Sequence, residues 1–131
     1  MKIDSALLDS LTAQAKASSR LRMNYDLRNS PKDGSQRMLN ALEPGTEVPI
    51  HRHMKSSETT VVLRGHLHEV FYDDSGQIID VIDMTPGGSV PALQIPLGQW
   101  HSVDVLESGT VIMEIKDGLY EQIGPNDILR F

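Results

Sequence analysis

Short runs of apolar or alternating residues, each ended by turn-forming residues, recur from Ser35 onward and constrain the fold more than any other feature. Turn signals such as Pro44-Gly45 and Ser108-Gly109 separate these runs, and turns at intervals of about 8–12 residues are typical of an antiparallel sandwich or barrel. The runs that predict strands cover residues 36–42, 59–63, 66–72, 78–84, 92–95, 101–106 and 110–115. The sequence therefore predicts an all-β fold after the first third of the chain.

The N-terminal segment has a different pattern. Its apolar residues recur at helical spacing, and they are Leu7, Leu8, Leu11 and Ala15. Asp4 can cap the start of this helix, and the polar stretch 20–34 predicts a loop or an irregular edge strand. We therefore expect one domain over residues 1–131, with a helix and arm at 1–34 and a β-barrel at 35–131. The tail from residue 120 is expected to lie across the barrel as a strand or loop.

The composition excludes several classes of protein. The chain has no cysteine, which excludes disulfide scaffolds, Cys-rich zinc sites, iron–sulfur clusters and Cys nucleophiles. It has 12 Lys and Arg against 18 Asp and Glu, a net charge of −6, whereas nucleic-acid binding needs clustered basic residues. No apolar run approaches the length of a membrane span, and the start lacks the apolar core of a secretory signal. We therefore expect a cytoplasmic protein that binds neither nucleic acid nor membrane.

Three histidines and one glutamate form the pattern that carries chemistry. His51 and His53 are two residues apart, so on a strand they point to the same face, about 7 Å apart. Glu58 opens the next predicted strand, and His101 begins a later one after a Pro-x-Gly turn. Three imidazoles and a carboxylate suit one divalent transition metal, Fe, Mn, Ni or Zn. On a six-coordinate ion this set leaves two positions for water or substrate.

This pattern resembles the two motifs of the cupin superfamily. The first motif matches without a gap, as Gly45…His51-Arg-His53…Glu58…Gly65, and the core of the second matches as Pro96-Leu-Gly98-Gln-Trp-His101. The second motif departs at Val90 and Val105, where a glycine and an asparagine are usual. The resemblance implies a cupin-type double-stranded β-helix, or jelly-roll barrel, with a short N-terminal helix and one bound divalent metal.

More of the chain is similar to the WbuC group of small cupin metalloproteins. The segments that carry this similarity are Arg20-Leu-Arg22-Met-Asn24, Gln36-Arg-Met-Leu-Asn-Ala41, Tyr72-Asp-Asp-Ser-Gly76 and Glu114-Ile-Lys116-Asp-Gly118-Leu-Tyr120. Members of that group are associated with bacterial surface-polysaccharide (O-antigen) gene clusters, and their reaction is not established. The resemblance therefore implies a metal site and a biosynthetic context, but no substrate.

Several other residues are candidates for chemistry around the ion. Glu114 and Lys116 share one face of a predicted strand. If that face lines the barrel, the pair supplies a general acid or base and a cation, and otherwise it is an exposed salt bridge of little value. Glu58 is a second candidate for moving protons. Arg37 and Tyr120 are weaker candidates for substrate contacts at the barrel mouth.

The remaining polar and aromatic signals have simpler interpretations. His66 and His68 form another pair two residues apart, which we interpret as an exposed or half-buried strand face rather than a second metal site. Trp100 is expected to pack between sheets or subunits rather than to hold substrate. A basic cluster before the barrel is either solvated surface or, if it folds over the opening, an anchor for carboxylate or phosphate; it consists of Arg20, Arg22 and Arg28.

These patterns predict a small metal-dependent enzyme acting on a sugar or sugar-derived metabolite by isomerisation, epimerisation or oxygen-dependent oxidation. The alternative is a non-catalytic, metal-dependent ligand-binding or regulatory module, and a weaker third option is a structural subunit with a fortuitous metal. Ionisable residues near the open metal positions would favour the enzyme, and a uniformly apolar wall would favour the module. The expected partners are a small-molecule ligand, such as a sugar or carboxylate, and a second copy in a homodimer.

Overall fold

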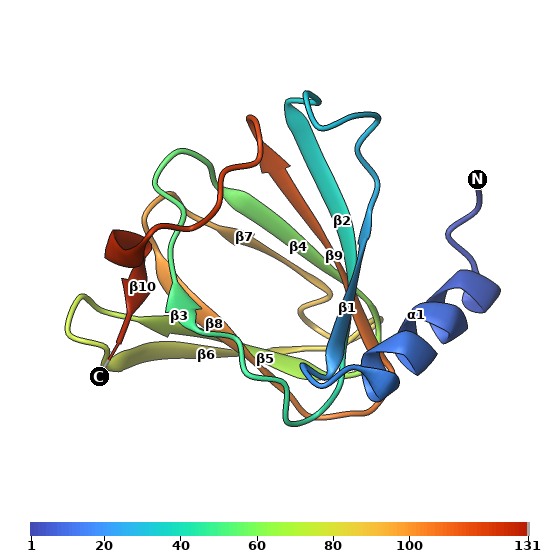
Figure 1. Ribbon diagram of the computed structural model, residues 1–131. Coiled ribbons are helices and arrows are strands. Elements are labelled where there is room, and N and C mark those ends of the chain that lie inside the picture. The colour runs from blue at the N-terminus through green and yellow to red at the C-terminus, as the bar shows by residue number, and fades with distance from the viewer. Residues whose placement is uncertain (131) are drawn as a thin grey trace.

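The computed structural model describes residues 1–130, and its ribbon shows a helix outside two facing antiparallel sheets (Figure 1). The helix, α1, spans Ser5–Ala17. The first sheet has the order β1 (Arg22–Asp26), β2 (Ser35–Leu42), β9 (Thr110–Asp117), β4 (Glu58–Arg64) and β7 (Ala92–Ile95). The second has the order β10 (Ile128–Leu129), β3 (Ile50–His51), β8 (Trp100–Val105), β5 (Leu67–Tyr72) and β6 (Ile78–Met84). This architecture confirms the predicted all-β jelly roll with a short N-terminal helix.

The helix packs on the outer face of the first sheet. The Asp4 carboxylate accepts a hydrogen bond from the Leu7 N–H at 3.0 Å, so it satisfies one of the free donors of the first turn. The apolar side chains that bury this contact are Leu8, Leu11, Ala15, Leu39, Ala41 and Val111. The following arm contributes β1, which pairs with β2 along its whole length. Of the two predictions for that arm, the edge strand is therefore correct.

The inner faces of the two sheets carry an apolar cluster, here called the apolar floor, and next to it a group of polar side chains. The floor consists of Leu42, Val62, Leu67, Met84, Val105 and Ile112. Side chains alternate between the faces of a strand, so Thr60, two residues before Val62, and Glu69, two residues after Leu67, also point inward. Both are almost fully buried. The strand register thus places polar side chains inside the barrel, above the apolar floor.

The predicted strands are all present in residues 1–130, and two of them, β6 and β7, have the predicted bounds. The sequence did not predict β3 as a strand, because it is only two residues long. The tail forms a 3₁₀ turn at Pro125–Asp127 followed by β10, which pairs with β3. Residue 131, included in the predicted tail and barrel, lies outside the described residues. No helix in residues 1–130 has the length and apolar character needed to cross a membrane.

Candidate metal centre

Three imidazoles from segments far apart in the sequence meet beside the paired strands β3 and β8. His51 of β3 is the cross-strand partner of His101 in β8. The ring of His53 follows β3, with its centroid 5.1 Å from that of His51 and 5.7 Å from that of His101. One ring nitrogen from each residue lies within 4.8 Å of the other two. The three predicted histidine ligands are therefore brought together.

Backbone carbonyls set the orientation of two of these rings. Nδ1 of His51 lies 2.8 Å from the Pro49 carbonyl oxygen, and Nδ1 of His101 lies 2.9 Å from that of Gln99. A carbonyl only accepts, so Nδ1 carries the proton and Nε2 keeps its lone pair. The buried Nε2 atoms of His53 and His101 have no hydrogen-bond partner. Buried polar atoms without partners are rare, and a metal ion would satisfy both.

The Glu58 carboxylate lies beside two of the three rings. Its Oε1 is 3.7 Å from Nε2 of His53, and its Oε2 is 3.6 Å from Nε2 of His101. Two ligands bound to one ion at about 2.1 Å each can be no more than about 4.2 Å apart, so both separations permit a shared ion. Glu58 is not part of the close group formed by the three imidazoles. The three imidazoles therefore fit a divalent metal, and the Glu58 carboxylate lies adjacent to two of them.

The electrostatics of these side chains also favour a cation. Burial, followed by the charge of His101, lowers the pKa of His51 to about 4. Burial, followed by the charge of Lys116, lowers the pKa of His53 to about 4. Both rings are therefore neutral at pH 7, as ligation requires. Burial opposes ionisation of Glu58, but its interactions with His101 and then Lys116 lower its pKa to about 2, so it is a carboxylate at neutral pH.

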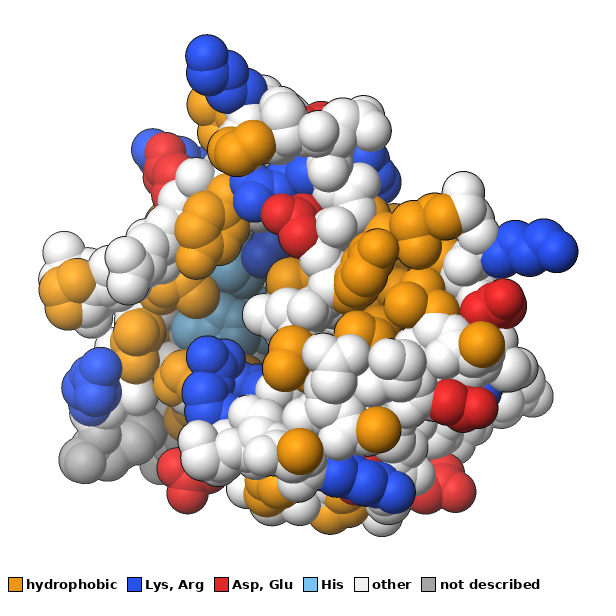
Figure 2. Space-filling view, turned by 45° about the vertical axis from the view of Figure 1, so that its right-hand side comes forward, with side chains coloured by type: hydrophobic (Ala, Val, Ile, Leu, Met, Phe, Trp, Pro, Cys, Tyr) orange, Lys and Arg blue, Asp and Glu red, His pale blue; other side chains and the backbone are white. Residues whose placement is uncertain are grey.

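A cavity of about 280 Å³, here called the barrel cavity, opens beside the imidazoles. In Figure 2, pale blue histidine side chains lie recessed in a hollow whose edge carries Lys or Arg side chains. The polar residues that line the cavity besides the predicted ligands are Arg20, Arg22, Asn24, Asn40, Thr60, Glu69, Glu114, Lys116 and Tyr120. The cavity wall above the apolar floor is therefore ionisable rather than uniformly apolar.

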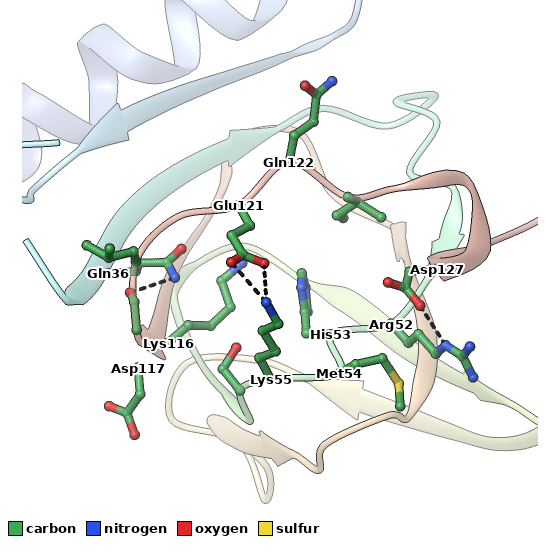
Figure 3. A pocket seen from close by; sticks show the side chains of 14 residues that line it. Gln36, Arg52, His53, Met54, Lys55, Lys116, Asp117, Glu121, Gln122 and Asp127 are labelled. Atoms are coloured by element: carbon green, nitrogen blue, oxygen red, sulfur yellow. Dashed lines mark hydrogen bonds and ion pairs between the residues drawn. The ribbon is translucent and has the colours of Figure 1, made fainter. Parts of the chain in front are cut away.

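A second hollow of about 190 Å³ adjoins the barrel cavity and shares His53 and Lys116 with it. Figure 3 shows the ion pair between Lys55 and Glu121 among its lining side chains. The Lys55 ammonium lies 3.1 Å from the Glu121 carboxylate, and both side chains are well exposed. Because His53 and Lys116 line both spaces, a ligand could approach the imidazoles from either side of these two residues.

A half-buried carboxyl group, that of Glu114, and a buried one, that of Glu69, face the barrel cavity. Burial and then the charge of Glu58 raise the pKa of Glu114 to about 7, against the opposing effect of Lys116. Burial, with Glu58 and Glu114 adding to it, raises the pKa of Glu69 well above its ordinary value. The sequence interpretation included Glu114 but missed Glu69. The signal was the alternation of β5, which places Glu69 on the same face as the buried Leu67.

The two predicted substrate contacts, Arg37 and Tyr120, lie in different places. Arg37 is not brought to the cavity, because the neighbouring Met38 lines the cavity and alternation turns Arg37 to the opposite face of β2. There its guanidinium donates to the carbonyls of Leu27 and Ser35 and to Asp33. Tyr120 lines the cavity but is mostly exposed.

The three arginines of the predicted basic cluster also lie in different places. Arg20 and Arg22 line the barrel cavity, which fulfils the condition for the predicted anion anchor. Arg28 instead forms an ion pair with Asp26 at 2.8 Å, and its guanidinium lies over the Tyr120 ring. Only two of the three arginines in the predicted cluster therefore face the cavity.

Trp100 lies away from the barrel cavity, as predicted, but it does not fill the space between the sheets. Its indole N–H donates to Asp74 at 2.9 Å. The Arg52 guanidinium carbon lies 4.3 Å from the centroid of its ring. The Trp100 side chain therefore lies on the outside of the second sheet, where Arg52 covers its ring and Asp74 accepts from its N–H.

A family model described as "Domain of unknown function (DUF6016)" matches residues 3–84, which is more than half of the 131 residues. The chain belongs to this family. No curated protein sequence matches the DUF6016 chain at a significant level. The part of the chain that the family model matches includes His51, His53 and Glu58, while His101 follows it.

Solved structures resemble the fold of this DUF6016 protein. KdgF from a Halomonas species has a TM-score of 0.60 and 14% identity, with 76% of this chain and 82% of that chain covered. A cupin 2 domain-containing protein from Halorhodospira halophila has a TM-score of 0.62 and 19% identity, with 79% and 68% covered. The capsular polysaccharide assembling protein CapF from Staphylococcus aureus has a TM-score of 0.67 and 20% identity, with 86% and 32% covered. The fold is that of the cupin superfamily.

Proposed function

We propose that this DUF6016 protein is a small metal-dependent enzyme that acts on an anionic sugar or a sugar-derived metabolite. The observation that carries the proposal is the pair of partnerless Nε2 atoms, those of His53 and His101, beside the ionised Glu58 carboxylate. These atoms border a cavity with ionisable walls. A cavity lined by perturbed titratable groups is the arrangement expected of an active site.

In this proposal His51, His53, His101 and Glu58 hold one divalent ion, Fe, Mn, Ni or Zn. Such an ion supplies Lewis acidity, which polarises a substrate oxygen and lowers the pKa of a neighbouring acidic proton. The imidazole-rich donor set favours these ions over Mg²⁺ or Ca²⁺, which prefer oxygen ligands.

The remaining wall residues have roles that suit proton transfer. Glu114 has a pKa of about 7, raised first by burial. A group with this pKa can accept a proton from substrate in one step and return it in the next, as isomerisation and epimerisation require. The Lys116 ammonium, 3.6 Å from Glu58, can offset negative charge that develops on substrate. These groups favour proton transfer over the oxygen-dependent alternative.

The substrate class follows from the arginines. Arg20 and Arg22 line the barrel cavity, and one guanidinium nitrogen of Arg22 donates to the Glu47 carbonyl at 2.9 Å. The Nε atom of Arg22 is buried and has no hydrogen-bond partner. A guanidinium with free donors binds carboxylate or phosphate well. We therefore infer a sugar acid or sugar phosphate as the ligand.

The biological context rests on resemblance. The segments shared with the WbuC group support membership of that group and a place in bacterial surface-polysaccharide (O-antigen) biosynthesis. CapF, of which 32% is covered by the match to this fold, is described as a capsular polysaccharide assembling protein. The chain spans 32% of CapF, so this comparison supports the context rather than a particular reaction.

The alternative is a non-catalytic ligand-binding or regulatory module. An apolar wall would favour that alternative, whereas the barrel cavity contains Glu69, Glu114 and Lys116. Binding alone does not need a half-buried carboxyl group, such as that of Glu114, with a pKa near neutrality. The wall therefore favours the enzyme.

Metal content is the first test. Protein purified and dialysed without chelator should hold close to one equivalent of a transition metal by elemental analysis. His53→Gln should lose most of it, and the matched control His66→Gln should retain the tightly held metal that survives dialysis, because His66 lies outside the barrel cavity. Protein that cannot be loaded, or equal losses in the two variants, would overturn the proposed site.

Turnover is the second test. Metal-loaded protein would be incubated with a panel of uronates and sugar phosphates in D₂O and followed by ¹H NMR. We expect deuterium incorporation or isomer formation with at least one compound, reduced by about two orders of magnitude or more in Glu114→Gln. Ligands that bind and return unchanged across the panel, with no solvent exchange, would favour the binding module.

We also propose a homodimer. Strand β6 is an edge of the second sheet, with Ile78, Ile79 and Val81 exposed on it, and an unpaired apolar edge tends to pair with another chain. Light scattering coupled to size-exclusion chromatography should give a mass of twice 14.5 kDa. Ile79→Lys should shift this mass to that of one chain, and an unchanged mass would place any association elsewhere.

A further inference from the structure

Two histidines and an aspartate gather on the outer face of the second sheet, away from the barrel cavity. His66 and His68 belong to the chain around the start of β5, and Asp83 belongs to β6. One ligand atom from each lies within 4.8 Å of the other two. The Nε2 atoms of both histidines contact the same carboxylate oxygen, Asp83 Oδ1, and the distance from His68 is 2.9 Å.

The backbone holds these three residues in place. His68 and Asp83 are direct partners in the β5–β6 ladder, so their side chains stand side by side on one face. The His66 N–H donates to the Thr110 hydroxyl at 3.2 Å, and its carbonyl accepts from the Leu106 N–H at 2.9 Å. The convergence of the three side chains is therefore set by the sheet rather than by flexible loops.

The surroundings favour a cation. On its other side His68 is paired with Asp104 of β8, so two carboxylates flank this imidazole across three strands. The side chains of His66 and His68 are 35% and 32% exposed, and that of Asp83 is 64% exposed. An ion could therefore enter directly from solvent and keep water on its remaining positions.

We propose that His66, His68 and Asp83 form a second, exposed site for a late first-row divalent ion such as Zn²⁺, called here the outer site. Two imidazoles and one carboxylate suit Zn²⁺, Cu²⁺ or Ni²⁺ and disfavour Mg²⁺ or Ca²⁺. The outer site is weaker than a buried four-ligand site because its three side chains are partly hydrated. It does not depend on the enzymatic function proposed for the barrel cavity.

A Zn²⁺ titration by isothermal calorimetry tests the outer site in the full chain. Wild-type protein should bind two equivalents in two classes, and the second class should be absent with Mg²⁺. Asp83→Asn and His68→Gln should each weaken the second class by about tenfold or more and leave the first class unchanged. The matched control is Asp80→Asn, which changes an exposed carboxylate on the same strand and should change neither class.

An NMR measurement identifies the binding residues independently of affinity. The second equivalent of Zn²⁺ should shift the ring resonances of His66 and His68 and leave those of His51, His53 and His101 as they were after the first. The variants are at the surface, and unchanged melting curves would show that they fold. The proposal is overturned if no second class appears, if Asp80→Asn weakens it as much as Asp83→Asn, or if the His66 and His68 rings do not respond.

Discussion

Lys116 lies directly opposite Glu58 in the ladder between β9 and β4, and its ammonium nitrogen is 3.6 Å from Glu58 Oε1. Its side chain is only 14% exposed, so its charge is poorly screened by solvent. Without a metal, this ammonium is a counter-ion for the buried carboxylate. With a metal bound, the metal ion and the Lys116 ammonium would lie close together, and their repulsion would weaken metal binding.

The first prediction follows from this competition. Lys116→Met should bind the barrel metal more tightly, by about tenfold or about 1.4 kcal/mol, because the substitution removes one Coulombic repulsion. Metal competition with a chromogenic chelator measures the change. Lys55→Met is the matched control, because Lys55 is 79% exposed and pairs with Glu121 instead. Weaker metal binding in Lys116→Met would mean that Lys116 supports the site rather than opposing it.

The second prediction concerns the pH dependence of metal affinity. A free imidazole titrates near pH 6.5, and from the sequence alone the affinity should decline below that value. Burial lowers the pKa of His51 and of His53 to about 4, so protons compete for these ligands only in more acidic solution. Because His51 and His53 stay unprotonated, the affinity should fall by less than about tenfold from pH 7 to pH 5.5 and then fall steeply towards pH 4. A tenfold loss already at pH 6 would contradict these lowered pKa values.

The third prediction uses the buried carboxyl of Glu69. Its folded-state pKa is raised above the ordinary 4.5, first by burial. The unfolded chain therefore releases this proton at a lower pH than the folded chain, so raising the pH above about 4.5 favours unfolding. Gln resembles the protonated acid, and Glu69→Gln should remove this cost.

We expect metal-free Glu69→Gln to melt a few degrees above wild type at pH 8, by about 3 °C or more, and close to wild type at pH 4. Thermal unfolding followed by circular dichroism measures both. The control Glu47→Gln changes an exposed glutamate and should melt like wild type at each pH. A lower melting temperature for Glu69→Gln at pH 8 would show that the ionised carboxylate is stabilised in the folded protein.

Much of this site could be predicted from the sequence because the strand period is so short. His51 and His53 share a face by alternation, and the turn before His101 marks the start of its strand, so only their convergence required the fold. The same alternation places Arg37 on the opposite face of its strand, because Met38 and Asn40 face the cavity and a shift of one residue changes the face. The sequence shows which residues of a strand share a face, but which of the two faces points inward depends on how the whole sheet packs.

Other features depended on contacts between distant segments. Glu69 was missed because an acidic residue between His68 and Val70 suggests a solvated strand, and only the facing sheet shows that it is buried. Asp83 was not connected with His66 and His68 because the pairing of β5 with β6 sets their register. Short strands such as β3 carry too few residues for any periodicity.

The fourth prediction concerns Gly65, the last glycine of the first motif. Its φ is +86°, and a Cβ there would lie 2.6 Å from the Thr110 Cα. Gly65→Ala therefore combines left-handed strain with a clash against backbone, and it should cost about 3 kcal/mol or more. Gly87 also has a positive φ, +76°, but nothing lies within 4 Å of an added Cβ. Gly87→Ala should cost only the strain, about 1–2 kcal/mol.

Urea unfolding of both alanine variants separates these two contributions, since they share the strain and differ in the contact. A difference of about 1 kcal/mol or more would show that the close approach of Gly65 to Thr110 is what requires glycine. Equal costs would mean that the backbone of β9 can move aside. In that case the Thr110 hydroxyl, which accepts from the His66 N–H, would also shift, and Gly65→Ala would weaken the outer site while Gly87→Ala would leave it intact.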